Sequence, residues 1–178
     1  TLEYGLIEGM SPALIGKHGI GSIYHSPAAA EATWQAMSAF ADQGGRGVFL
    51  RPATEMKCAG APLKYTFITD DRLRRAGTRS KSELIYCAQN KGLFSVPIVS
   101  EKVRMLFGER KVKVNYDHVL TGIDLGRKVA FHKTPNGIAE ITANGQQGDQ
   151  PRYNLAGQRV GKDYRGVVVE QGRKIIIK

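Results

Sequence analysis

The spacing of apolar positions between residues 26 and 44 predicts an amphipathic helix. Apolar residues recur three and four positions apart in this segment, and Trp34, Met37 and Ala41 fall on one face. Because this is the period of an α-helix with one buried stripe, we expect these three side chains to lie in the core. The segment opens with Ser-Pro and closes with glycine, which are typical of the first and last turns of a helix.

Farther along, short apolar runs alternate with further helical patterns. The runs predict strands at 47–50, 83–88, 111–116, 118–125 and 128–133, and helices at 63–75 and 96–110. Strands and helices in alternation, followed by a small antiparallel meander, are the order of a dinucleotide-type unit with a parallel sheet. The predicted fold class is therefore α/β, an incomplete Rossmann-like nucleotide-domain unit with a parallel sheet and a β-meander.

The composition changes at about residue 134. Residues 134–150 are polar and rich in turn-forming residues, which is typical of a linker. Residues 151–178 then alternate strand-like runs with glycine turns and end in a hairpin pattern that is too short to be stable alone. We therefore expect an α/β domain at 1–133, a linker at 134–150 and a small C-terminal β appendage at 151–178.

The chain is basic, with a net charge of +10 over 178 residues, and residues 151–178 carry half of this excess. A basic domain can bind nucleic acid or an anionic surface. No basic strand interleaved with aromatics, helix-turn-helix pattern or zinc spacing accompanies the charge, so we expect a solvated basic face and no nucleic-acid partner. The two cysteines and four histidines are not spaced as metal ligands, so no metal site is expected.

The segment EMKCAGAPLK, residues 55–64, lies between a predicted strand and a predicted helix. Such a loop lies at the carboxyl edge of the sheet, where α/β folds bind ligands. The start of the helix and Lys57 both favour a thiolate at Cys58, and the small residues Gly60 and Ala61 allow a flat ligand to approach closely. The glycine fingerprint of a phosphate loop is absent at this position, which disfavours NAD(P). The residues alone also allow a second interpretation, in which Cys58 is a small buried hydrophobe.

The pattern P-x-T-x-x-K-C-A-G-A-P-x-K at 52–64, followed in order by FSVPI and VNYDHVL, resembles the central part of the sulfide:quinone oxidoreductases. These are FAD-dependent enzymes of the pyridine nucleotide-disulfide oxidoreductase family. The resemblance runs from about Leu2 to Lys133. It implies a membrane-associated flavoprotein that oxidises sulfide and passes two electrons through FAD to quinone.

The resemblance also implies residue roles. Cys58 corresponds to a family cysteine that forms a disulfide or polysulfide bridge with a second cysteine close to the flavin, and sulfide attacks this bridge to give a persulfide. Gly60 and Ala61 would border the flavin as cofactor-binding residues. The first FAD fingerprint and the late segment with the partner cysteine are not found in this sequence, so we expect this chain alone to bind FAD weakly or not at all. Cys87 lies in a predicted strand and is expected to be inert.

The last 26 residues are similar to short C-terminal β segments of exported or surface proteins of the Bacteroidetes. This second resemblance implies a bacterial protein, and it allows export as an alternative to a position at the membrane periphery. It also supports an alternative function, in which the chain is an exported, non-catalytic module whose β tail serves sorting or attachment.

Several other charged or titratable residues have two interpretations. His18 and His25 flank GIGSIY, and either they are surface loop residues or one of them transfers a proton. His118 and His132 lie on predicted strands and are expected to face solvent. Asp70 is expected to lie on a solvated helix face with its arginine neighbours.

Overall fold

The computed structural model describes residues 3–54, 56–143, 152–154, 159–161, 164–170 and 173–177. The α-helices are α1 (Pro27–Gln43), α2 (Ala61–Arg75) and α3 (Pro97–Glu109), and short 3-10 turns lie at Tyr4–Leu6, Pro12–Leu14 and Arg79–Lys81. The first six strands are β1 (Gly45–Leu50), β2 (Ser82–Cys87), β3 (Val112–Asn115), β4 (Val119–Asp124), β5 (Val129–Thr134) and β6 (Gly137–Thr142). The last four are β7 (Arg152–Asn154), β8 (Arg159–Val160), β9 (Gly166–Glu170) and β10 (Arg173–Ile177).

The first sheet is parallel, with the strand order β1-β2-β3. Helix α2 connects β1 to β2, and α3 connects β2 to β3, so each connection is a strand–helix–strand crossover. Strands β4, β5 and β6 form an antiparallel meander. The predicted α/β unit with a parallel sheet and a meander is confirmed.

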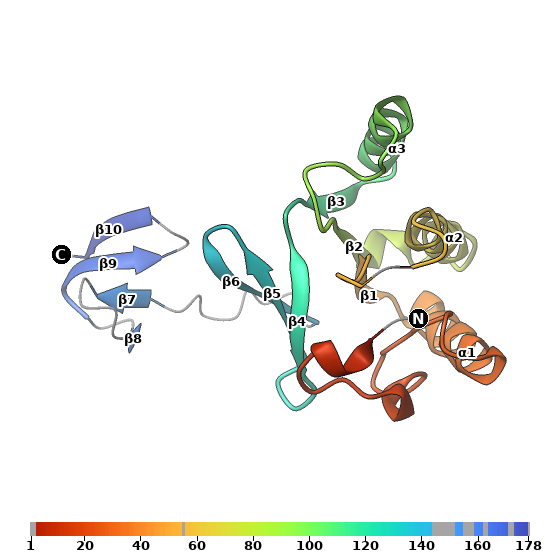
Figure 1. Cartoon of the computed structure of the whole chain (residues 1–178), viewed down its shortest axis with the longest axis horizontal. Coiled ribbons are helices and arrows are strands. Elements are labelled where there is room, and N and C mark those ends of the chain that lie inside the picture. Colours follow the sequence, from red (N-terminus) through yellow and green to blue (C-terminus); the bar gives the residue numbers. More distant parts are fainter. Residues whose placement is uncertain are drawn as a thin grey trace.

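The parallel sheet has a hydrophobic cluster on each face. On one face, residues from all three helices pack on β2 and β3 around the fully buried Leu73, Leu84 and Phe107. On the other face, Ile85 and Cys87 of β2 pack against Ile141 of β6. Figure 1 shows the same arrangement, with the helices on one side of β1–β3 and the meander on the other.

Helix α1 begins and ends where its sequence predicts, but Trp34 is not in the core. The Ser26 hydroxyl accepts a hydrogen bond from the Ala29 amide at 3.1 Å, which caps the first turn. The Trp34 side chain is 42% exposed, and the Arg72 guanidinium lies 4.6 Å from its ring centroid. The buried stripe instead repeats every fourth residue, at Ala29, Thr33, Met37 and Ala41. Thr33 takes the inward position because its hydroxyl donates to the Ala29 carbonyl at 2.7 Å and thus needs no water.

Residues 137–142, expected to belong to the linker, form β6. The polar residues that precede β6 form the β5–β6 turn, in which the Thr134 hydroxyl donates to the Gly137 carbonyl at 2.9 Å. Strand β6 then pairs with β5 along its whole length, and Ile141 becomes a buried residue. A turn-rich composition therefore marked a tight hairpin here. Residues 144–150 of the predicted linker lie outside the described residues.

The N-terminal segment pairs with the edge of β4 at Glu8. The Glu8 amide donates to the Thr121 carbonyl at 2.9 Å, and the Ile123 amide donates to the Glu8 carbonyl at 2.8 Å. Gly9 follows with φ +74, and a Cβ at this position would lie 2.4 Å from the Ile123 carbonyl oxygen. Only glycine therefore allows this close approach.

The described parts of the C-terminal segment form a third sheet, with the order β10-β9-β7-β8. The predicted hairpin is the antiparallel pair β9 and β10, in which Gly166 lies opposite Ile177. Strands β7 and β8 extend this hairpin to four strands. Residues 171 and 172, between β9 and β10, lie outside the described residues.

Candidate functional site

Cys58 lies in the loop that leads from the carboxyl end of β1 to the start of α2. It is an exposed, free cysteine. Its carbonyl accepts hydrogen bonds from the Ala61 amide at 3.1 Å and from the Tyr24 hydroxyl at 3.3 Å. The backbone of the loop is thus tied to α2 and to the N-terminal segment, while the sulfur faces solvent. Cys58 is therefore not the small buried hydrophobe of the second interpretation.

Gly60 is the N-cap residue of α2 and has φ −80, a conformation that any residue adopts. A Cβ built on Gly60 would lie 3.8 Å from Phe94 Cε2 and 3.9 Å from Cys58 Sγ, both ordinary contacts. Neither backbone strain nor crowding within the chain therefore requires glycine at this position. The same distances show that the Cys58 sulfur and the Phe94 ring flank one small patch of surface, with Gly60 between them.

Phe94 also lines the cavity at the carboxyl ends of β1 and β2. The cavity has a volume of about 260 Å³. Its walls come from the residue after β1, from the end of β2 and from the loop that follows β2. The lining residues are Arg51, Tyr86, Ala88, Gln89, Asn90, Gly92, Leu93, Phe94 and Ser95. Open α/β sheets place ligands at this edge, so the cavity and the Cys58 loop form one candidate region.

Two residues of the cavity lining carry buried polar atoms without partners. Arg51 Nε and Gln89 Oε1 are buried and have no hydrogen-bond partner. Tyr86 lies on the wall, where burial of its ring raises the pKa of the hydroxyl to about 12, while the nearby Arg51 charge acts in the opposite direction. Arg51 is the one charged residue among those that line the cavity.

Sequence reasoning identified Cys58, Gly60 and Ala61 but missed the residues around them. Tyr24 is 34 positions from Cys58, and no sequence signal connects the two. Burial, and then the Cys58 charge, raise the pKa of Tyr24. Arg51 follows directly after the predicted strand at 47–50, and this position in the sequence indicates that it lies at the carboxyl edge of the sheet.

The second cysteine lies in a different environment. Cys87 is fully buried on the meander side of β2, and this burial raises the pKa of its thiol to about 12. Both cysteines are free, so they form no disulfide with each other. The expected inertness of Cys87 agrees with this burial.

The four histidines fall into two groups. His18 and His25 are exposed, and the His25 ring packs edge-on against Tyr4 with centroids 5.6 Å apart. The expectation that His132 faces solvent is wrong, since its side chain is fully buried and both ring nitrogens lack partners. Burial, and then the charge of the nearby His118, lower the pKa of His132 to about 4. Val129 and His132 are the buried residues of β5, and because they lie three positions apart in a strand without a bulge, they point to opposite faces of the meander.

Within the described ranges, no three His, Cys, Asp or Glu side chains come together as a metal-binding group. Among the helices of the same ranges, none has both the length and the apolar composition needed to cross a bilayer.

Comparison with protein families gives no matching family model. The chain is similar to three curated proteins named sulfide:quinone oxidoreductase, mitochondrial. It is 34% identical to the Mus musculus protein over 119 residues, which are 67% of this chain and 26% of that protein. It is 33% identical to the Dictyostelium discoideum protein and 27% to the Schizosaccharomyces pombe protein, each over 136 residues and 29% of that protein. The chain therefore spans less than a third of the length of the curated relatives that it matches.

Solved structures show the same fold. The sulfide:quinone oxidoreductase of Aquifex aeolicus aligns with a TM-score of 0.52 and 17% identity over 72% of this chain and 34% of that chain. A chain of the Tetrahymena thermophila mitochondrial ATP synthase aligns with a TM-score of 0.60 and 13% identity over 80% of this chain and 36% of that chain. These identities are low, so the likeness supports the Rossmann-like architecture alone.

Proposed function

We infer that this chain, a relative of the sulfide:quinone oxidoreductases over about three quarters of its length, carries the sulfur-reactive cysteine of a flavin-dependent oxidoreductase of that kind. The observation that carries the inference is Cys58. It is exposed at the carboxyl edge of a parallel sheet and is flanked by Phe94 and by a glycine that the chain itself does not need. The sulfide and quinone substrates of the complete enzyme are part of this proposal.

The proposed chemistry at Cys58 is sulfur transfer. In the oxidised form, Cys58 is joined to a second cysteine by a disulfide bond, and hydrosulfide attacks this bond. One S–S bond forms as another breaks, which leaves a persulfide on one cysteine and a thiolate on the other. The buried Cys87 is not a suitable second cysteine, because it lies beneath the meander.

The residues around Cys58 hold the reacting atom in place. The Ala61 amide and the Tyr24 hydroxyl fix the Cys58 carbonyl, while the Cys58 side chain remains exposed. Gly60 and Ala61 are small residues, so they leave space for a flat ring close to the Cys58 sulfur.

The described residues do not form a cavity large enough to enclose FAD. FAD, when bound, supplies a two-electron acceptor that passes electrons to quinone. The cavity of about 260 Å³ is below the range of pockets that hold drug-sized ligands, and FAD is larger still. We therefore expect this chain alone to bind FAD weakly or not at all. A purified chain that is yellow, with one flavin per chain, would contradict this expectation.

A persulfidation experiment tests the proposal. The full chain is treated with inorganic polysulfide, whose sulfane sulfur the Cys58 thiolate attacks while a shorter polysulfide leaves. Peptide mass spectrometry is expected to find one added sulfur atom on Cys58 in the wild type and in Cys87→Ser, and none in Cys58→Ser. Modification of Cys58 no faster than that of a free cysteine would contradict the proposed role.

Membrane attachment, bacterial origin and export also remain proposals. The three curated relatives are named mitochondrial, which is a property of those proteins. The exported, non-catalytic module differs from the enzyme proposal in one measurable way. It predicts that Cys58 reacts like any exposed cysteine.

A further inference from the structure

We propose that Arg74 and Arg110, at the C-terminal ends of α2 and α3, together bind a doubly charged oxyanion such as sulfate or hydrogen phosphate. The proposed site is separate from the sulfur chemistry at Cys58, which precedes the opposite end of α2. Three observations support the site. They are the charge that the two arginines leave uncompensated, their contacts with one shared oxygen atom and their exposure to solvent.

The buried carboxylate of Asp70 has more cations around it than it can neutralise. Its Oδ1 atom accepts a hydrogen bond from Arg79 Nε at 2.6 Å, and its Oδ2 atom accepts from Arg74 Nε and Arg110 Nη1, each at 2.8 Å. Arg79 is mostly buried and donates its other N–H groups to backbone carbonyls, so it is the counter-ion that Asp70 needs. Arg74 and Arg110 therefore share an oxygen of a carboxylate whose charge is already balanced.

Neighbouring groups offset only part of the remaining positive charge. Among the described residues, no carboxylate besides Asp70 pairs with Arg74 or with Arg110. Asp71 is adjacent to Asp70 in α2, but its carboxylate pairs with Arg75 at 2.7 Å. The C-terminal ends of α2 and α3 each contribute about half a negative charge. This is less than the two positive charges of the arginine pair, so the ends of these helices attract an anion.

The geometry of the arginine pair suits an oxyanion. Because both side chains contact the same Asp70 oxygen, the two guanidinium groups lie next to each other. The Arg110 guanidinium also lies 5.5 Å from the centroid of the Phe67 ring, which restricts its orientation. Within the described part of the chain, each of the two guanidinium groups donates only to Asp70, although each has further N–H donors. The side chains of Arg74 and Arg110 are 48% and 39% exposed, so a ligand can reach them from solvent.

Charge and shape determine which anion fits the pair. Two adjacent guanidinium groups repel each other, and a doubly charged anion between them more than offsets this repulsion. A tetrahedral oxyanion also presents several oxygens to the planar fork of N–H donors, as in paired arginine–phosphate contacts. Chloride has a single charge and no such arrangement of acceptors, and water brings no charge at all. Sulfate and hydrogen phosphate are therefore the expected ligands.

Titration of the full chain with sodium sulfate at constant ionic strength tests the proposal. Binding is followed by NMR of the arginine Nε–H groups and of the backbone amides. We expect saturable shifts of the Nε–H signals of Arg74 and Arg110 and of the amides of residues 109–112. Hydrogen phosphate should shift the same signals, and chloride should bind about tenfold more weakly or less, because it forms fewer charge-assisted hydrogen bonds.

Substitutions separate the arginine pair from the general basic charge of the chain. Arg74→Gln and Arg110→Gln should each weaken sulfate binding about tenfold or more, through loss of a charge-assisted contact. Arg75→Gln is the matched control, because it removes the same charge from the next position of α2, where the side chain is 77% exposed and outside the pair. It should change the affinity for sulfate by less than about twofold, since exposed charges are screened.

Each outcome of these measurements bears on the proposal. Absence of saturable shifts in the wild type overturns it, whether or not the variants fold. Equal weakening by Arg75→Gln and by the two pair variants also overturns it, because sulfate would then respond to net charge alone. Equal affinity for sulfate and chloride contradicts a doubly charged ligand. Cys58→Ser should bind sulfate like the wild type, so this site and the sulfur chemistry at Cys58 can fail independently.

Discussion

At the scale of single residues, the surroundings of each side chain decide its chemistry. Cys58 and Cys87 have the same thiol, but Cys58 meets solvent in a loop whereas Cys87 lies under the meander. The histidines differ in the same way, since His18 is exposed while His132 has no contact with water. Two predictions follow from these differences in burial.

Iodoacetamide is expected to modify Cys58 selectively in the native chain at neutral pH. The exposed sulfur can be attacked directly, whereas Cys87 is both inaccessible and held as the neutral thiol by its raised pKa. Peptide mass spectrometry measures the two rates separately, and Cys87 should react only after denaturant is added. Equal labelling of both cysteines in the native chain would contradict the burial of Cys87.

Burial of His132 should make the free energy of unfolding depend on pH. The pKa of His132 is about 4 in the folded chain and about 6.5 when unfolded, so the unfolded state takes up the proton first as the pH falls. The stability that neutral His132 contributes is therefore present above pH 6.5 and is lost as the pH falls toward 4. Between pH 7 and pH 5 we expect a loss of about 2 kcal/mol. Urea unfolding at several pH values between 7 and 5 measures this loss. The variant His18→Gln, at an exposed position, is the control and should lose as much stability over this range as the wild type.

At the scale of elements, one buried carboxylate joins the end of α2 to its neighbours. Asp70 was expected on a solvated face, but its side chain is fully buried and pairs with Arg74, Arg79 and Arg110. Burial alone would raise the pKa of Asp70, but the hydrogen bonds from the three arginines outweigh it and lower the pKa. Arg79 also donates to the Arg110 carbonyl at 2.7 Å. The network thus ties the ends of α2 and α3 to the turn before β2.

Asp70→Asn is expected to lower the free energy of unfolding by about 3 kcal/mol, because it leaves the mostly buried Arg79 guanidinium without its charged partner. Asp71→Asn is the matched control. Asp71 is the next residue of the same helix, and its pair with Arg75 is exposed on both sides. This control should change stability by no more than about 0.5 kcal/mol. Urea unfolding measures both, and equal effects would contradict the role given to the buried network.

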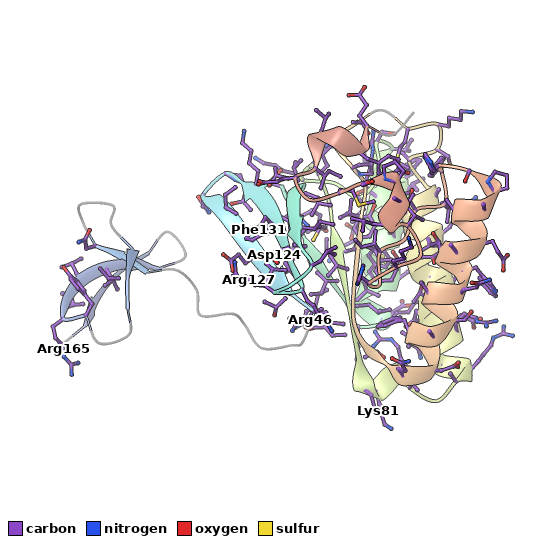
Figure 2. The ribbon with its side chains drawn as sticks, turned by 90° about the horizontal axis from the view of Figure 1, so that it is seen from below. Arg46, Lys81, Asp124, Arg127, Phe131 and Arg165 are labelled. Atoms are coloured by element: carbon purple, nitrogen blue, oxygen red, sulfur yellow. The ribbon has the colours of Figure 1, made fainter. Side chains whose placement is uncertain are left out.

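At the scale of the whole molecule, the parallel sheet is covered on both faces by different means. The helices cover one face, and the meander covers the other. A polar clamp secures the second contact. Arg46 of β1 pairs with Glu83 of β2, which also pairs with Lys113 of β3, and Arg46 Nη1 donates to the Thr142 carbonyl of β6 at 2.8 Å. Figure 2 shows Arg46 where the parallel sheet meets the meander.

Arg46→Met is expected to loosen the meander from the sheet and to lower the free energy of unfolding by about 1–3 kcal/mol, since Glu83 and the Thr142 carbonyl each lose a donor while Glu83 keeps only Lys113. Relative to the wild type, hydrogen exchange of this variant should show a larger loss of amide protection in β6 than in β2. Arg127→Gln is the control, because Arg127 pairs with Glu140 at the surface of the meander itself. It should leave protection of β6 nearly unchanged. Loss of protection that is equal in β2 and β6 would argue against a specific clamp.

The sequence by itself determined the order of elements in the α/β unit, the start and end of α1, the C-terminal hairpin and the loop position of Cys58. These features depend on periodicity, on capping residues and on residues that are close along the chain. Only the tertiary structure decided that Trp34 lies outside, that Asp70 and His132 lie inside, that residues 137–142 form a strand, and that Tyr24 adjoins the candidate region. The physical reason is that burial and pairing depend on which surfaces the chain brings together. The sequence pattern of one segment does not contain its partner.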